Sequence, residues 1–314
     1  QHHKVDYLGV AFADEGVELR QAGISLPIVV MNPEEKSFPQ MLAHGLEPEI
    51  YSFRMLETWN RMVVQEGRGL SRIHLKVDSG MYRLGFFEEE AGELLAHLRR
   101  MPQLQVASVF SHLAGSDEAR HDAFTREQAA VFQRFCDQLQ GGLEAPFLRH
   151  LLNSAGVERF PQFQFDMVRL GIGLYGIGAA SDGVLQTVAT LKTYISQIKT
   201  VRPGATIGYG RRGVLPEGSR IAVLPIGYAD GLSRALSNGR GGVNIGGQMV
   251  PIVGSICMDM CMVDVSRLSV KEGDEVVVFG QEPSVSEVAE LIGTIPYEVL
   301  TGISRRVKRV YFKE

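Results

Sequence analysis

The chain has 314 residues, of which 45% are hydrophobic and 22% are charged, and its formal net charge is -4 at pH 7. These values predict a soluble globular protein of two domains, and they give no electrostatic support for binding to nucleic acid or to an anionic membrane. No apolar run is long enough to cross a membrane. Cys136, Cys257 and Cys261 have neither a metal-ligand spacing nor the even number that disulfides require, so we expect a cytoplasmic protein.

Apolar runs alternate with longer amphipathic stretches over the first part of the chain. The expected strands are Tyr7–Phe12, Pro27–Met31, Glu49–Phe53, Ile73–Asp78, Ala107–His112, Phe147–Asn153 and Met167–Gly171. The expected helices are Asp14–Ala22, Phe38–His44, Met55–Glu66, Glu88–Arg100 and His121–Leu139, and the expected helix caps are Asp14, Ser37 and Ser154. Repeated β–α units predict a parallel sheet, and their regularity favours a TIM-like α/β barrel. The strands are one too few for a closed barrel, so we expect one β–α unit upstream of residue 1.

Shorter alternating segments, separated by tight turns, follow from about residue 186. The strands expected there are Thr187–Val201, Arg220–Pro225, Gly242–Ile245, Met249–Ile256, Met260–Val265 and Glu275–Phe279. A short helix is expected at Ser286–Ile292 and a last strand at Val307–Phe312. We therefore divide the chain into an α/β barrel at residues 1–185 and a mainly antiparallel β domain at residues 186–314.

Ionisable residues follow one side of the expected strand Ile73–Asp78. His74, Lys76 and Asp78 alternate with apolar residues, and a turn then leads to Arg83. One interpretation is a half-solvated antiparallel strand with a polar outer face. The other is a strand that carries ionisable groups into a binding site. The strand by itself favours the first interpretation, and the motifs around it favour the second.

The last two expected barrel strands end in signals for a phosphate group, which barrels commonly bind at this place. Ser154 begins a helix, whose unpaired amide groups favour an anion, and its hydroxyl adds a donor. Gly171 and Gly173 leave backbone N–H groups unshielded. The same residues also fit a helix cap and a glycine-rich loop that only pack, but their combination at this position favours a phosphate site.

Two further polar residues lie at the ends of expected strands. Arg169 would point into the barrel mouth, where it needs an acceptor and keeps its own proton. His112 ends another strand, and we interpret it as an orienting partner because a single histidine is more often structural than catalytic.

Ordered motifs connect these positions. They are Lys76-Val77-Asp78-Ser79-Gly80-Met81 with Arg83-Leu84-Gly85, Asn153-Ser154, Met167-Val168-Arg169 with Gly171-Ile172, Ile207-Gly208-Tyr209-Gly210, Ile226-Gly227-Tyr228-Ala229-Asp230-Gly231 and Cys257-Met258-Asp259. Together they resemble alanine racemase over essentially the whole chain. The resemblance implies a barrel that binds pyridoxal 5'-phosphate (PLP), a following β domain and a homodimer with shared active sites. It also implies interconversion of L-alanine and D-alanine, which supplies D-alanine for peptidoglycan.

The resemblance further implies which residues hold the cofactor. The positions that match ligands of the cofactor phosphate are Ser154, Gly171, Ile172 and Tyr297. Arg169 matches the arginine that faces the pyridine nitrogen, with His112 as its hydrogen-bond partner. An arginine cannot protonate that nitrogen.

The remaining implied roles concern the substrate and proton transfer. Arg83 matches a residue that contacts the substrate carboxylate, and in the family it is held by a carbamylated lysine, which Lys76 resembles. Tyr209 matches a catalytic base, and Met258 a backbone donor to the substrate, both delivered by the partner subunit. In such a two-base mechanism one base removes the α-proton and an opposite base returns one, and a phenol with a pKa of about 10 needs nearby positive charge for this role. Supporting positions are Asn153, Tyr228, Cys257 and Asp259.

The resemblance fails at one place. In the family, the lysine that holds PLP and acts as the second base belongs to a Lys-Ala-x-Ala-Tyr-Gly-type motif on the first barrel strand, and no such motif occurs here. Lys4, Lys36 and Lys192 lie in unsuitable contexts. We therefore expect a truncated or cleaved alanine racemase, and the racemase part of a fusion with a peptidoglycan ligase would fit.

The residues leave other interpretations open. A PLP-dependent amino-acid decarboxylase of the same fold type is one, although Cys257-Met258-Asp259 and the Tyr209 loop favour a racemase. A non-catalytic PLP-binding carrier with a bare barrel is a second, and the β domain argues against it. An inactive fragment that folds and dimerises is a third. Cys257 fits a packing role better than a nucleophile because no histidine is close to it in sequence.

Overall fold

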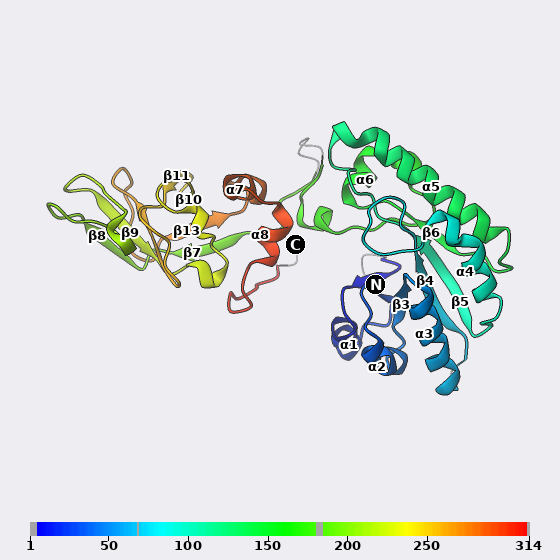
Figure 1. The fold of residues 1–314 in the computed structure, drawn as a ribbon. Helices are drawn as coiled ribbons and strands as arrows, with labels where there is room; N and C mark the ends of the chain where they lie inside the picture. Colours follow the sequence, from blue (N-terminus) through cyan, green and yellow to red (C-terminus); the bar gives the residue numbers. More distant parts are fainter. Residues whose placement is uncertain (1–4, 68, 180–184, 313–314) are drawn as a thin grey trace. The chain divides into compact units, whose positions relative to one another are not determined.

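A computed structural model describes residues 5–67, 69–179 and 185–312 (Figure 1). The chain divides into two compact units, of which the first comprises residues 1–171 with 178–181 and the second residues 172–177 with 182–314. Each unit has a hydrophobic core of its own. Among the described helices, none combines the length and the apolar character that a bilayer crossing requires.

The first unit is built on one parallel sheet. Its strands follow the chain order and are β1 Leu8–Val10, β2 Ile28–Val30, β3 Glu47–Ile50, β4 Ser71–Lys76, β5 Leu104–Phe110 and β6 Leu148–His150. Its helices are α1 Ala13–Gln21, α2 Phe38–Ala43, α3 Phe53–Gln65, α4 Ala91–Leu98, α5 Asp122–Gln140 and α6 Ser154–Arg159. Figure 1 shows the helices along the outer side of the curved sheet. The predicted β–α repeat and the barrel-like parallel sheet are thus confirmed.

The strand β4 decides between the two interpretations of its ionisable residues. It pairs in parallel with β3 on one side and with β5 on the other, and it is buried on both faces. Leu75 is fully buried in the core beneath the helices, and His74 and Lys76 are buried on the opposite face. The half-solvated antiparallel interpretation is therefore wrong, because both faces of a sheet of this kind are covered.

Two groups of local predictions for the first unit are wrong. Residues 167–171 form no strand, because the N–H groups of Asp166 and Met167 both donate to the Arg149 carbonyl and no regular ladder follows. Asn153, not Ser154, caps α6, since its side chain accepts a hydrogen bond from the Gly156 N–H at 2.8 Å.

The other two expected caps also differ from the structure. Asp14 lies inside α1, whose start is instead held by Glu15, because the Glu15 carboxylate accepts from the N–H groups of Ala11 and Phe12. Ser37 precedes α2 but caps nothing with its side chain, which donates to the Glu34 carbonyl.

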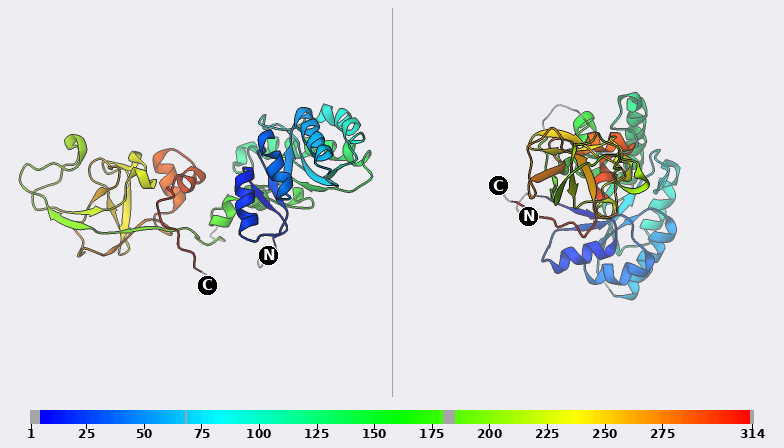
Figure 2. Two further views of the ribbon diagram at one scale, coloured as in Figure 1. Left: turned by 90° about the horizontal axis from the view of Figure 1, so that it is seen from below. Right: turned by 90° about the vertical axis from the view of Figure 1, so that its left-hand side faces the viewer.

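The second unit contains two antiparallel sheets. One has the order β11-β10-β13-β7 and the other β12-β9-β8. Figure 2 shows the strands of this unit from two further directions. The strands are β7 Leu191–Tyr194, β8 Gln197–Thr200, β9 Arg220–Leu224, β10 Gly242–Ile245, β11 Gln248–Pro251, β12 Cys261–Asp264 and β13 Glu275–Phe279. Two helices follow, α7 Val285–Ile292 and α8 Pro296–Thr301. The antiparallel β character and the helix at α7 are confirmed.

Three details of the second unit differ from prediction. The long strand expected at Thr187–Val201 is split into β7 and β8, which belong to different sheets. Helix α8 was not expected. Val307–Phe312 is not a strand, since it pairs with no strand among the described residues, and Tyr311 and Phe312 are 86% and 87% exposed.

Leu75→Ala is expected to lower the free energy of unfolding by about 2–5 kcal/mol, because the removed atoms leave a cavity in the core of the first unit. Urea unfolding can be followed by the fluorescence of Trp59, the one tryptophan of the chain, which is buried in the same core. Leu70→Ala is the matched control: its side chain is 63% exposed, and the change should stay within about 0.5 kcal/mol. Equal effects of the two substitutions would contradict the assignment of Leu75 to the core.

Candidate active site

Polar side chains gather on one face of the parallel sheet, near the C-terminal ends of its central strands. The register pairs Glu49 of β3 with His74 of β4, and Lys76 of β4 with Phe110 of β5, which pairs in turn with His150 of β6. Each of these residues is buried. Because side chains alternate along a strand, the polar groups share one face while the apolar residues between them enter the core.

A chain of hydrogen bonds crosses this face from Arg169 to Glu47. Because arginine only donates, Nδ1 of His150 accepts from Nη1 of Arg169 at 2.9 Å, and the neutral ring carries its proton on Nε2. That group donates to the Ser108 hydroxyl at 2.8 Å, and the hydroxyl donates to Nδ1 of His74 at 2.6 Å. Nε2–H of His74 then donates to the Glu47 carboxylate at 2.7 Å. The direction of every bond therefore follows from the guanidinium at one end.

Further acceptors hold the guanidinium of Arg169. Its Nη atoms donate to the backbone carbonyls of Ser111, His150 and Leu151 at 2.6–3.0 Å. Nδ1 of His112, the partner expected from the sequence, lies at 3.4 Å, so His150 provides the shorter bond. Nε–H of Arg169 has no hydrogen-bond partner within the described part of the chain. One donor with a fixed direction thus remains for a ligand.

Both histidines beside Arg169 are neutral. Burial, together with the positive charges of Arg169, Lys76 and Arg83, lowers the pKa of His112 to about 3. Burial, with Arg169 as the next cause, lowers the pKa of His150 well below its ordinary value. Neutral rings can accept from the guanidinium, whereas protonated rings would repel it.

The charges near this edge of the sheet do not cancel. Among the described residues, the charges that act on Lys76 are those of Arg83 and Arg169 and of the carboxylates of Glu49 and Asp78, so three positive groups lie near two negative ones. Nζ of Lys76 lies 3.9 Å from Oε1 of Glu49. Burial lowers the pKa of Lys76 to about 8 and raises that of Glu49 to about 7, and each charge counteracts the shift of the other. An excess of positive charge favours an anionic ligand.

The loop that presents Arg83 is organised by one buried carboxylate. Asp78 is 6% exposed and accepts from the backbone N–H groups of residues 80–83 at 2.9–3.1 Å. Gly85 has φ +132°, and a Cβ there would lie 2.5 Å from the Asp78 nitrogen. The loop therefore needs the aspartate and the glycine, and it leaves the Arg83 side chain exposed.

Two of the residues expected to bind a phosphate, Ser154 and Gly171, are in contact. The Gly171 N–H donates to the Ser154 hydroxyl at 3.1 Å, and Ser154 is 5% exposed. Asn153 accepts from the hydroxyl of Ser116 at 2.9 Å besides capping α6. Ile172 follows Gly171 directly and begins a short 3-10 helix at Ile172–Tyr175. The first unit thus brings Ser154 and Gly171 together at the edge that also carries Arg169.

In the second unit, three loops that carry expected site residues pack on one another. The Ser255 hydroxyl donates to the Tyr209 carbonyl at 3.5 Å. The Tyr228 N–H donates to the Cys257 carbonyl at 3.1 Å. A Cβ on Gly227 would lie 2.3 Å from the Met258 carbonyl oxygen, so only glycine allows this approach. Tertiary packing therefore places Tyr209, Tyr228, Cys257 and Met258 in one cluster.

The side chains of this cluster are mostly exposed. Tyr209 is 73% exposed, Met258 53% and Tyr228 43%. Tyr209 begins the 3-10 helix Tyr209–Arg211 between two glycines with positive φ, Gly208 and Gly210. The phenol is therefore presented away from the core of its own unit.

Sequence reasoning missed an arginine that ties this cluster together. Arg306 donates to the carboxylates of Asp230 and Asp259 at 2.7 Å each. It lies 47 positions beyond Asp259, and a single arginine after a helix carries no local signal of such a role. Tyr297, in α8, is 49% exposed.

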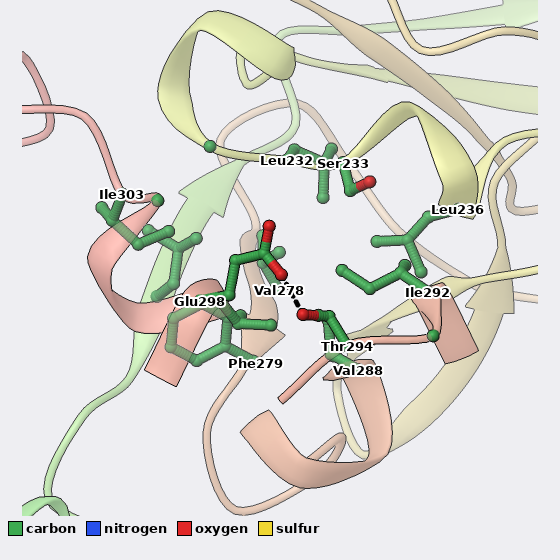
Figure 3. A pocket seen from close by; sticks show the side chains of 15 residues that line it. Leu232, Ser233, Leu236, Val278, Phe279, Val288, Ile292, Thr294, Glu298 and Ile303 are labelled. Atoms are coloured by element: carbon green, nitrogen blue, oxygen red, sulfur yellow. Dashed lines mark hydrogen bonds between the residues drawn. The ribbon is translucent and has the colours of Figure 1, made fainter. Parts of the chain in front are cut away.

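The second unit also contains a cavity of about 410 Å³ between α7, α8 and β13 (Figure 3). Its wall is mainly apolar, and the Thr294 hydroxyl donates to the Glu298 carboxylate beside it. None of the site residues expected from the sequence lines it. The cavity is therefore separate from the cluster around Tyr209.

Family models match both halves of the chain. The model described as alanine racemase, N-terminal domain, matches residues 1–179, and alanine racemase, C-terminal domain, matches residues 188–311. The chain belongs to the alanine racemase family. This family consists of PLP-dependent isomerases that interconvert L-alanine and D-alanine, which confirms the reaction and the cofactor that the sequence motifs imply.

Individual relatives agree along nearly the whole chain. The alanine racemase of Sorangium cellulosum is 40% identical, over 97% of this chain and 84% of the relative. The alanine racemase of Clostridium tetani is 37% identical, over 98% of this chain and 82% of the relative. Among solved structures, alanine racemase from Clostridium difficile 630 has a TM-score of 0.92 at 36% identity and covers 99% of this chain and 83% of that one. Alanine racemase from Bartonella henselae, with covalently bound pyridoxal phosphate, has a TM-score of 0.89 at 29% identity, covering 99% and 86%.

Ser108→Ala is expected to lower the free energy of unfolding by about 1–3 kcal/mol, because Nε2–H of His150 and Nδ1 of His74 both lose their partner in a buried site. Urea unfolding measured by Trp59 fluorescence gives this value. Ser269→Ala, on the exposed surface, is the control and should change it by less than about 0.5 kcal/mol. An unchanged stability of Ser108→Ala would contradict the continuous hydrogen-bond chain.

Proposed function

We propose that this chain holds PLP at the C-terminal ends of β4, β5 and β6 and acts on the α-proton of alanine. The observation that carries the proposal is the hydrogen bonding of Arg169. Its Nη atoms donate to backbone carbonyls and to the His150 ring, and its Nε–H remains available to a ligand. Burial lowers the pKa of Arg169 to about 10, so the group stays protonated at neutral pH. Such a group donates a hydrogen bond to a ring nitrogen without giving up its proton.

The residues present suit an anionic cofactor with a phosphate group. The excess positive charge of Lys76, Arg83 and Arg169 over Glu49 and Asp78 offsets negative charge on the ligand. The residues that would hold the phosphate, by their match to the family, are Ser154, Gly171, Ile172 and Tyr297. When bound, PLP draws electrons from Cα of the amino acid and so acidifies its hydrogen.

Tyr209 would move the proton at Cα on one face of the substrate. Its exposure and its glycine-flanked turn support delivery to another subunit rather than to its own. We assign Arg83 and the backbone N–H of Met258 to the substrate carboxylate. In this homodimer, residues 1–185 hold the cofactor, and residues 186–314 of the partner supply Tyr209 and Met258 with their supports Tyr228, Cys257 and Asp259. Lys76, His112 and Asn153 support the cofactor side.

The opposite proton transfer needs a lysine in the motif that these 314 residues do not contain. Lys76 is buried against Glu49, Lys36 and Lys192 form surface ion pairs, and Lys4 lies outside the described residues. We assign this base to a lysine motif that is not among these 314 residues. The proposed setting is the cytoplasm, where D-alanine is made for peptidoglycan. The relatives are alanine racemases, so the decarboxylase alternative is not favoured.

Formation of D-alanine from L-alanine tests the function. The 314-residue chain with added PLP is expected to show no turnover, and a longer chain with the upstream lysine motif is expected to turn over. In the longer chain, Tyr209→Phe should lower kcat by at least about 100-fold, because it removes a proton-transfer group. Carbon dioxide release from lysine or ornithine would support the decarboxylase instead. Turnover by the 314 residues alone would contradict the assignment of the second base.

Mixing two inactive variants of the longer chain tests the shared site. Arg83→Ala removes a substrate-binding group from the protomer that holds the cofactor. Tyr209→Phe removes the proton-transfer group that its partner would supply. If each site combines both protomers, random re-association should restore about a quarter of the wild-type activity, because half of the dimers are mixed and each has one intact site. Each variant re-associated with itself is the control. No recovery, with mixed dimers present by mass, would contradict sharing.

A further inference from the structure

The hydrogen-bond chain that starts at Arg169 takes one side chain from each of four neighbouring strands. Glu47 begins β3, His74 lies in β4, Ser108 in β5 and His150 ends β6. The three inner members are at most 3% exposed, and buried polar groups are costly unless they are hydrogen-bonded. Neither the sequence motifs nor the proposed roles give Glu47 or Ser108 a task. The chain therefore needs an explanation.

The pairing of β4 with β5 is irregular at the place where two members of the chain meet. Ile73 pairs with Val106, but the next residue of β4, His74, pairs with Ser108, so that β5 has one extra residue, Ala107. In a regular ladder, His74 would lie opposite Ala107. Bulges re-aim side chains and are frequent next to active sites. The irregularity therefore brings the Ser108 hydroxyl opposite the His74 ring.

Aromatic neighbours hold the two histidine rings of the chain in place. The His150 ring stacks on Phe110, with 4.8 Å between the ring centres and 9° between the planes. The His74 ring meets Tyr7 edge to face, with 5.7 Å between the centres and 87° between the planes. Packing thus fixes the ring planes, and the hydrogen bonds fix which nitrogen faces which partner.

Glu47 is shared between the buried chain and the exposed edge of the sheet. Its Oε2 atom accepts from Nε2–H of His74 at 2.7 Å, and its Oε1 atom lies 3.6 Å from Nε of Arg72. The Arg72 side chain is 41% exposed and also donates to the Tyr7 hydroxyl. Arg72 and His74 therefore compete for the negative charge of one carboxylate.

The chain can transmit charge but not a proton. Passing a proton along it would require the guanidinium of Arg169 to give one up to His150, which a guanidinium does not do. Every bond of the chain donates toward Glu47, so the carboxylate makes each acceptor in turn more basic, and such bonds strengthen one another by roughly 10–30% each. Nη1–H of Arg169 then donates more strongly to His150, and the polarised guanidinium donates more weakly through Nε–H.

We propose that Glu47 and Ser108 are positioning residues that act on Arg169 through the two histidines. The charge of Glu47, at the opposite end of the chain, sets how strongly Nε–H of Arg169 donates to the ligand, and Arg72 opposes this effect. The inference deepens the proposed function and rests on it for the meaning of that Nε–H. The polarisation itself is a property of the 314-residue chain and can be measured without a ligand.

Nitrogen-15 NMR of the full chain, labelled at histidine, tests the transmission. The signal of Nδ1 of His150 is identified by its absence from His150→Gln. In Glu47→Gln this signal is expected to move toward the position of a ring nitrogen without a donor, because the bond from Arg169 weakens. Ser108→Ala should move it in the same direction, since it interrupts the chain. Glu47→Asp keeps the charge and should restore most of the wild-type position.

Arg72→Gln is the variant that separates transmission from a loosened sheet. It removes the competing positive charge and leaves the Glu47 carboxylate to His74, so the Nδ1 signal of His150 should move in the direction opposite to that in Glu47→Gln. A general loosening would move the signal in the same direction in both variants. Glu66→Gln, exposed at the end of α3, is the distant control and should leave the signal unchanged.

An unchanged His150 signal in a folded Glu47→Gln variant, or shifts of the same direction in Glu47→Gln and Arg72→Gln, would overturn the proposal. Folding is checked by the fluorescence of Trp59, which is buried in the same unit. If Glu47→Gln does not fold, Arg72→Gln at its exposed position still decides, because the proposal requires it to shift the signal toward a stronger bond.

The effect on the ligand is measured in the longer chain with PLP. The absorption maximum of the bound cofactor should move in opposite directions in Glu47→Gln and Arg72→Gln. A maximum that stays fixed while the His150 signal moves would overturn the action on the ligand. A longer chain that binds no PLP would contradict the proposed function and leave the shifts of His150 in place, so the two failures are distinguishable.

Discussion

The polar face of the parallel sheet depends on the guanidinium of Arg169, which is half-buried. Its donors fix the Nδ1 atoms of the neighbouring histidines as acceptors, and that choice determines every hydrogen bond from His150 through Ser108 and His74 to Glu47. A buried cation is costly unless its donors are satisfied. The strand ends supply these acceptors as backbone carbonyls, so the sheet itself holds the guanidinium in place.

A parallel sheet that carries so many ionisable groups on one face is stabilised by pairing them. Glu47 takes the end of the hydrogen-bond chain, Glu49 faces Lys76, and Asp78 holds the loop of Arg83 through backbone N–H groups. The remaining excess of positive charge is what an anionic ligand requires. Stability and binding are therefore served by the same arrangement, in which each carboxylate has a different partner.

In the second unit, the side chains of the cluster around Tyr209 are mostly exposed rather than buried. Gly227 allows the loop of Tyr228 to contact the carbonyls of Cys257 and Met258, and Arg306 joins Asp230 to Asp259. The backbone of the cluster is thus fixed while the phenol of Tyr209 stays exposed. Functional side chains are often carried in this way, on loops that a rigid scaffold positions.

The sequence by itself determined the β–α repeat, the antiparallel character of the second part and the family, because hydrophobic periodicity and ordered motifs are local signals. The expected site residues came mainly from the resemblance to the family, and they stay predictions, although glycines and polar residues after strands marked some of their loops. Only the tertiary structure decided that residues 167–171 are not a strand, that Asn153 rather than Ser154 caps α6, and that His150 is the closer partner of Arg169. It also revealed Glu49 beside Lys76 and Arg306 between two aspartates. The physical reason is that these choices depend on which groups meet across strands and loops, and a hydrogen bond or ion pair between residues far apart in sequence leaves no pattern in either segment.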